Sequence, residues 1–81
     1  MQTVIANNCD LRLARIIAML CSRASRIELT YYPDDETYLL HVDAITYMMI
    51  VGSDDDVFDF EPRNADTPCN ITFSMPDFLI D

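Results

Sequence analysis

Carboxylates are the side chains in this sequence whose number and spacing best suit binding or chemistry. Eight of them gather in two turn-forming segments and on the strand-like segment after the second: Asp34, Asp35, Glu36, Asp54, Asp55, Asp56, Asp59 and Glu61. Alternate residues of a strand lie about 6.5–7 Å apart, and each strand of duplex DNA carries a phosphate roughly every 3.4 Å. Acids on turns and alternate strand positions can therefore imitate phosphates, and we predict that these eight bind a partner.

Metal chemistry is less well supported by the same residues. An EF-hand calcium loop needs glycine at its sixth position, and counting from Asp54 that position is Asp59. Three cysteines and one histidine equal a zinc ligand set in number, but they lack the short paired spacings of zinc sites. We therefore expect neither a metal nor another cofactor.

Catalysis is not indicated either. The only histidine, His41, stands among apolar residues of a strand-like segment, where a structural role is expected. The only glycine is Gly52, so the chain has no glycine-rich phosphate loop and no nucleophile elbow. General acid–base work by paired carboxylates is the enzymatic alternative that stays open, and we expect a protein that is not an enzyme.

Length and composition set the class of protein. The chain has 81 residues, 51% of them hydrophobic, which fits one acidic domain over residues 1–81 and excludes a fully disordered chain. Its net charge of −9 disfavours direct binding to nucleic acid or an anionic membrane and favours a basic partner. No secretory signal is visible, and three widely spaced cysteines do not form a disulfide pattern. We expect a cytoplasmic protein.

Charge divides the sequence into two halves. Residues 1–26 carry a net charge of +3, and residues 27–81 carry −12. The basic half predicts an amphipathic helix over about residues 9–25, with Asn8 as N-cap. Its expected buried stripe is Leu13, Ile16, Ile17, Leu20, Cys21 and Ala24. The other side carries Arg12, Arg15, Arg23 and Arg26, the last two near the negative end of the helix dipole. These arginines could pair with the chain's own acids or with a second copy.

After Arg26 the hydrophobic period changes from 3.6 to 2, which indicates strands. The expected strands are 27–32, 37–43, 45–51, 57–61 and 70–75, followed by an apolar tail at 78–80. At Asp43-Ala44 either a tight hairpin or one continuous bulged strand is expected, because neither residue favours positive φ. The predicted fold is α+β: one N-terminal amphipathic helix packed on an antiparallel meander of four to five strands. Whether residues 3–5 add a strand stays open.

Apolar residues exceed what one helix can cover. Segments 38–40 and 47–51 are apolar on both faces of the expected sheet, although a sheet with one wet face should alternate. Either the two ends of the chain close the second face, or another polypeptide covers it. In the second case Phe58, Phe60 or Phe78 are candidate apolar anchors inside an acidic rim.

In size, acidity and predicted architecture the chain resembles phage-encoded inhibitors of host defence, the anti-CRISPR and DNA-mimic proteins. These proteins share no sequence signature, so the resemblance assigns no residue. It implies an inhibitor that blocks the nucleic-acid site of a basic partner, in the host cytoplasm if phage-encoded. The alternative is a homodimeric structural or adaptor module, such as a small chaperone or an antitoxin-like protein, that uses an apolar sheet face. A purely solubilising role for the acids also stays open.

Overall fold

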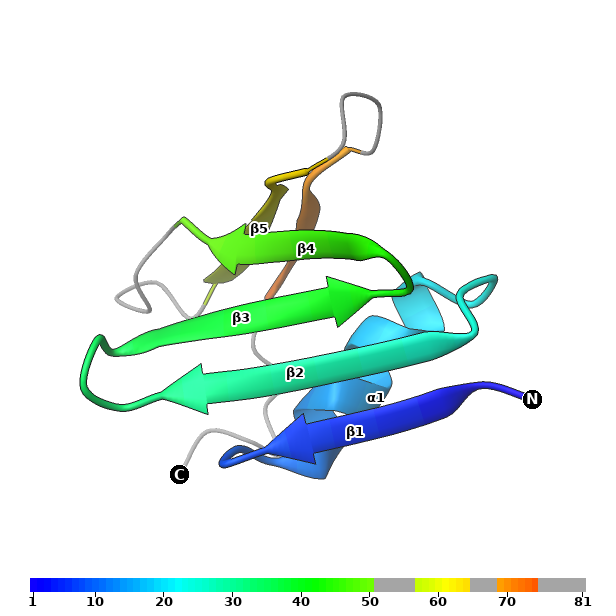
Figure 1. Cartoon of the computed structure of the whole chain (residues 1–81), viewed down its shortest axis with the longest axis horizontal. Coiled ribbons are helices and arrows are strands. Elements are labelled where there is room, and N and C mark those ends of the chain that lie inside the picture. Colours follow the sequence, from blue (N-terminus) through cyan, green and yellow to red (C-terminus); the bar gives the residue numbers. More distant parts are fainter. Residues whose placement is uncertain (51–56, 65–68, 75–81) are drawn as a thin grey trace.

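The structure is a computed structural model that describes residues 1–50, 57–64 and 69–74. In this part of the chain one helix packs on a six-stranded sheet whose strands follow the order of the sequence (Figure 1). The elements are β1 (Thr3–Asn7), α1 (Leu11–Leu20), β2 (Arg26–Tyr32), β3 (Thr37–Val42), β4 (Ile45–Met49), β5 (Val57–Pro62) and β6 (Ile71–Ser74). The predicted α+β class is confirmed. The acidic run 54–56 and the tail 78–80 lie outside the described residues.

The sheet is mixed, which corrects the prediction of an antiparallel meander with four to five strands. β2 to β6 are antiparallel neighbours, but β1 pairs in parallel with β2, from Thr3 opposite Arg26 to Asn7 opposite Thr30. A parallel pair needs a crossover of a dozen or more residues, and the segment that contains α1 supplies it. The open question about residues 3–5 is thereby answered, since they belong to the edge strand β1.

The helix is shorter than the predicted span of residues 9–25. Asn8 takes a left-handed conformation with φ 61°, so the N-cap is Asp10, whose carboxylate accepts a hydrogen bond from the backbone N–H of Arg12 at 2.8 Å. At the other end, the side-chain amide of Gln2 donates to the carbonyls of Ala18, Cys21 and Ala24. The carbonyl of Cys21 also accepts the backbone N–H of Ala24 at 3.0 Å, across the turn that follows the helix, so Gln2 adds a side-chain donor to carbonyls at the helix end.

The buried side of α1 is also rotated from the prediction. Leu13, Ala14, Ile17 and Ala18 are buried, whereas Leu20 is 56% exposed. Small alanines let the helix approach the sheet closely. Arg23 follows the helix and Arg26 begins β2, so neither completes the last turn of α1 as predicted.

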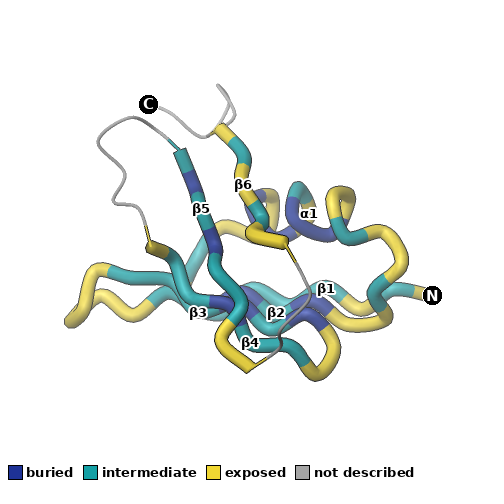
Figure 2. Tube along the Cα trace, turned by 90° about the horizontal axis from the view of Figure 1, so that it is seen from above, coloured by how far each residue is buried: buried dark blue, intermediate teal, exposed yellow. Residues whose placement is uncertain are grey.

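One short helix closes the core because the sheet curls. A helix of ten residues is about 15 Å long, and α1 packs mainly on β1 and β2. β5 and β6 turn up from the other strands on the side that carries α1 (Figure 2). As a result the ring of Tyr38 on β3 meets that of Phe58 on β5, with centroids 5.4 Å apart. The core comprises Leu13, Ala14, Ile17, Ala18, Ile27, Leu29, Leu40, Val42, Tyr47, Phe58 and Phe60.

Asp43 and Ala44 form a tight hairpin, so the alternative of a continuous bulged strand is wrong. Val42 pairs with Ile45 across the turn, and Asp43 adopts φ 52°, a region that Asp tolerates better than most residues. Its carboxylate accepts hydrogen bonds from the backbone N–H groups of Ser25 and Arg26, both at 3.0 Å. A turn that looked unfavourable on local grounds is therefore fixed by contacts with a distant segment.

Candidate partner-binding surface

The sheet face opposite α1, called here the outer face, carries the apolar residues in excess of the core. Leu39, Met48 and Glu61 are neighbours across β3, β4 and β5. Ile50 lies opposite Asp59, to whose carbonyl its N–H donates at 2.8 Å. Ile50 and Tyr32 are each 43% exposed. We call Tyr32, Leu39, Met48 and Ile50 the outer strip.

The N-terminal segment does not cover this face, because it forms the edge strand β1 within the sheet. No other described segment lies across the outer face (Figure 2). Since both α1 and the raised strands β5 and β6 occupy the inner side, the outer face is convex. A convex apolar strip of this kind can enter a concave site on another molecule.

The phenylalanines predicted as anchors do not belong to this surface. Phe58 is 2% exposed and Phe60 is 0% exposed, both within the core, and Phe78 lies outside the described residues. The alternation of side chains along the strand already indicated this. Asp59 and Glu61 share one face of β5, so Phe58 and Phe60 must lie on the other face. The outer strip takes their place, and its members Leu39 and Met48 come from the segments already noted as apolar on both faces.

The structure brings part of the predicted acidic set to one region. Asp34, Asp35 and Glu36 are exposed on the turn between β2 and β3, next to Tyr32 of the outer strip. Asp59 and Glu61 are half-buried on the outer face of β5 and border Ile50 and Met48. The run 54–56 lies outside the described residues. β2 and β4 run in the same direction, so the chain leaves both strands at the same end of the sheet.

None of these five described acids is neutralised by an arginine. Within the described residues the ion pairs are Arg12–Asp10 at 2.7 Å and Arg26–Glu28 at 2.9 Å, and neither includes a member of the predicted set. The hydrogen bonds from Arg12 hold the pKa of Asp10 below its usual value. The pKa of Glu28 is likewise lowered, first by its hydrogen bond from Arg26 and then by that from Asn7.

The arginines lie mostly away from the acidic turn. Arg23 follows the C-terminal end of α1, and Arg26 begins β2, whereas the acidic turn follows the far end of β2. Arg63 lies just past β5 and donates its N–H to the carbonyl of Thr46 near the start of β4. Arg23, Arg26 and Arg63 therefore lie towards the end of the sheet opposite the acidic turn, whereas Arg15 lies within α1 and Arg12 is paired with Asp10 at the start of α1.

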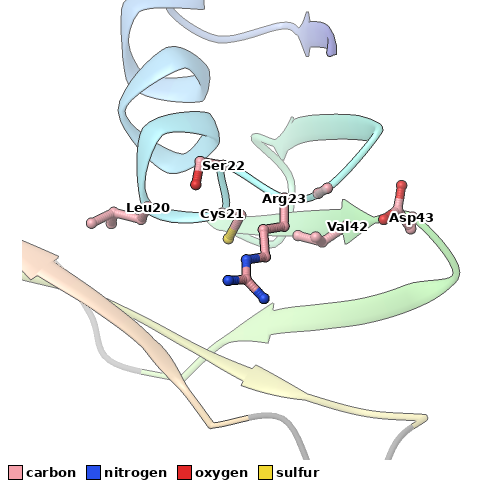
Figure 3. Close-up of a pocket in the computed structure, with 7 residues that line it drawn as sticks. Leu20, Cys21, Ser22, Arg23, Val42 and Asp43 are labelled. Atoms are coloured by element: carbon pink, nitrogen blue, oxygen red, sulfur yellow. The ribbon is translucent and has the colours of Figure 1, made fainter. Parts of the chain in front are cut away.

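An open hollow of about 440 Å³ lies between the end of α1 and the hairpin of β3 and β4. In Figure 3 the guanidinium of Arg23 extends past the thiol of Cys21, and Asp43 stands at the far side. Burial raises the pKa of the Cys21 thiol, which disfavours the reactive thiolate. None of the five described members of the predicted acidic set lines this hollow. Nor does any group of three His, Cys, Asp or Glu side chains in the described segments form a metal site.

His41 occupies the outer face between Glu28 and Thr46 and is half-buried.

Comparison of the chain with models of known protein families, with curated proteins and with solved structures gives no match. In the described residues no helix has the length and apolar character to cross a bilayer.

Proposed function

We propose that this protein is a small acidic inhibitor that binds a basic, nucleic-acid-handling protein and blocks its nucleic-acid site. The observation that carries the proposal is the outer strip on a convex face, bordered by carboxylates that, among the described residues, form no ion pair with an arginine. The strip supplies apolar contact area for affinity. The acids supply attraction to a basic groove, which mainly accelerates association.

The shape supports insertion into a groove. Nucleic acid presents its phosphates on a convex surface, and a groove that accepts it is concave and basic. The outer face is convex, and its acids at positions 59 and 61 are separated by about 6.5–7 Å, the spacing of alternate strand residues. The arginine-rich end of the sheet would point away from such a partner.

The homodimeric alternative fits the outer face less well. Two copies packed face to face about a two-fold axis beside β5 would bring the carboxylates of Asp59 and Glu61 towards the same groups of the second copy. Like charges at close range in a partly desolvated contact are unfavourable. A foreign basic partner meets no such repulsion.

The proposal is tested by capture with immobilised full-length protein from a cell lysate, followed by elution with a double-stranded oligonucleotide. The retained protein is then purified, and its association rate is measured at increasing salt. Asp59→Asn with Glu61→Gln should slow association about tenfold at low salt, and charge reversal at positions 54–56 should slow it further. The difference should shrink as salt rises.

The matched control is Asp10→Asn with Glu28→Gln, which makes the same change in net charge but removes acids that are paired with arginines. Asparagine also preserves N-capping at position 10. Equal association rates for the two double variants would refute the assigned surface. A retained protein that the oligonucleotide does not displace would refute the inhibition of nucleic-acid binding.

A further inference from the structure

Among the described residues, β1 forms an edge of the sheet that no other strand covers. It is the terminal strand in the strand order, and its sequence Thr3–Asn7 contains no charge, proline or glycine. Natural edge strands usually carry a lysine, a proline, a bulge or a covering segment that blocks pairing with other chains. α1 does not serve as this cover, because it packs on the inner face of β1 and β2 (Figure 2).

The register of β1 shows which backbone groups face outward. The N–H of Thr3 donates to the carbonyl of Ser25 at 2.8 Å, so Thr3 directs its backbone groups towards β2. Alternation along a strand then places the N–H and C=O groups of Val4 and Ala6 on the free edge. Both residues are therefore able to pair with a further strand without losing any bond to the other described residues.

The distribution of acidic side chains around β1 indicates which molecule supplies the further strand. Two copies with a net charge of −9 each repel wherever their acids face one another. Residues 1–9 contain no acidic side chain. The nearest acids on the neighbouring segments, Asp10 and Glu28, are both paired with arginines. As far as the described residues extend, the edge of β1 is thus a region where a second copy can approach without meeting an unpaired carboxylate.

We propose that β1 pairs with β1 of a second copy in an antiparallel arrangement about a two-fold axis at Ile5. In this register Val4 of each copy lies opposite Ala6 of the other, and their outward groups form four backbone hydrogen bonds. Ile5 lies opposite Ile5 as a non-hydrogen-bonded pair, in which Cα atoms approach to about 4.5 Å. Thr3 lies opposite Asn7, so the full strand is paired.

This dimer is independent of the proposed function and compatible with it. A two-fold axis that makes neighbouring strands antiparallel is perpendicular to the sheet, so both outer faces remain on the same side. The two outer strips then stay open, and the contact uses the sheet edge and not the face. Loss of the dimer would leave the binding surface of each copy intact.

The first test is sedimentation velocity of the full chain from micromolar to millimolar concentration. Val4→Pro removes an outward N–H that makes no hydrogen bond within the described segments, and proline is tolerated on the open side of an edge strand. The wild type should show reversible dimerisation, and Val4→Pro should be monomeric while its circular dichroism matches the wild type. Val4→Ala, which keeps the N–H, should still dimerise. A monomeric wild type over the whole range would overturn the proposal.

The second test does not depend on how well the proline variant folds. In a Cys69→Ser background, which removes the exposed native thiol, Ile5→Cys should give a disulfide-linked dimer under mild oxidation because the two-fold axis places it opposite itself. Thr3→Cys, whose opposite residue is Asn7, should cross-link far less. Equal cross-linking at the two positions, or none at position 5, would refute this register.

Discussion

The two faces of the sheet belong to the same strands, but their side chains have different roles. On β5 the inner residues Phe58 and Phe60 are almost fully buried. The outer residues Asp59 and Glu61 are half-buried and lie next to Ile50 and Met48. On β4 the inner Tyr47 is buried, and its outer neighbour Met48 is only partly covered. Stability is therefore concentrated on one face, and the capacity to bind is left on the other.

This difference shows that apolar content alone does not locate a binding surface. The two phenylalanines of β5 already stack with Phe73, whose ring centroid lies 5.3 Å from that of Phe58 and 6.4 Å from that of Phe60. What remains for a partner is the outer strip, which the curled sheet leaves on its convex side. Substitutions on the two faces should consequently separate folding from binding.

The largest expected effect is on the inner face. Phe60→Ala should lower the free energy of unfolding by about 3–5 kcal/mol, because Phe60 is 0% exposed and its removal leaves a cavity. Met48→Ala on the outer face should cost far less, since Met48 is only partly buried. Urea denaturation followed by circular dichroism measures both. Similar losses for the two variants would contradict the division between the faces.

The sequence predicted the burial of the inner face well, but it predicted the edge strand β1 and the ends of α1 poorly. Alternation placed Ile27, Leu29, Leu40 and Val42 on one side, and all four are buried, because period-2 patterning reflects burial directly. β1 was left open because its five residues hold only three apolar ones in a row and pair with a strand about 23 positions away. The helix ends also depended on distant contacts, such as that of Gln2 with the carbonyls at the end of α1.

The candidate surface was predicted only in part, because some of it depends on contacts between segments that are distant in the sequence. Acid clustering is visible in the sequence, and it identified Asp59 and Glu61 beside the outer strip. The strip itself depends on the register between β3 and β4, which brings Leu39 next to Met48. It also depends on the curl of the sheet, which no local pattern encodes. The choice of phenylalanine anchors failed because large apolar residues were weighed without asking which side of β5 they share.

A smaller effect should come from an exposed acid that serves structure and not binding. Asp43→Ala should lower the free energy of unfolding by about 1–2 kcal/mol, because alanine is strained at φ 52° and offers no acceptor to the N–H groups of Ser25 and Arg26. Asp43→Asn keeps both the tolerance of this conformation and a side-chain oxygen, so it should recover most of the loss. Thermal unfolding of the two variants measures the difference, and equal losses would show that the carboxylate geometry is not what fixes the hairpin.

The smallest effect concerns Glu28, which shares the outer face with Asp59 and Glu61 but is paired with Arg26 at 2.9 Å. Because its pKa is lowered in the folded state, the unfolded chain binds more protons at this group in the acid range. Its contribution to stability is therefore complete above the unfolded pKa of about 4.3 and is lost as the pH falls through the lowered folded value.

Glu28→Gln should accordingly reduce the loss of stability between neutral pH and the acid range relative to the wild type. The measurement is the free energy of unfolding by urea at a series of pH values down to the acid range. Glu61→Gln is the matched control, because it removes one carboxylate from the same face without removing an ion pair. If the curve of Glu28→Gln runs parallel to that of the wild type throughout, the ion pair does not distinguish Glu28 from the acids that we assign to partner binding.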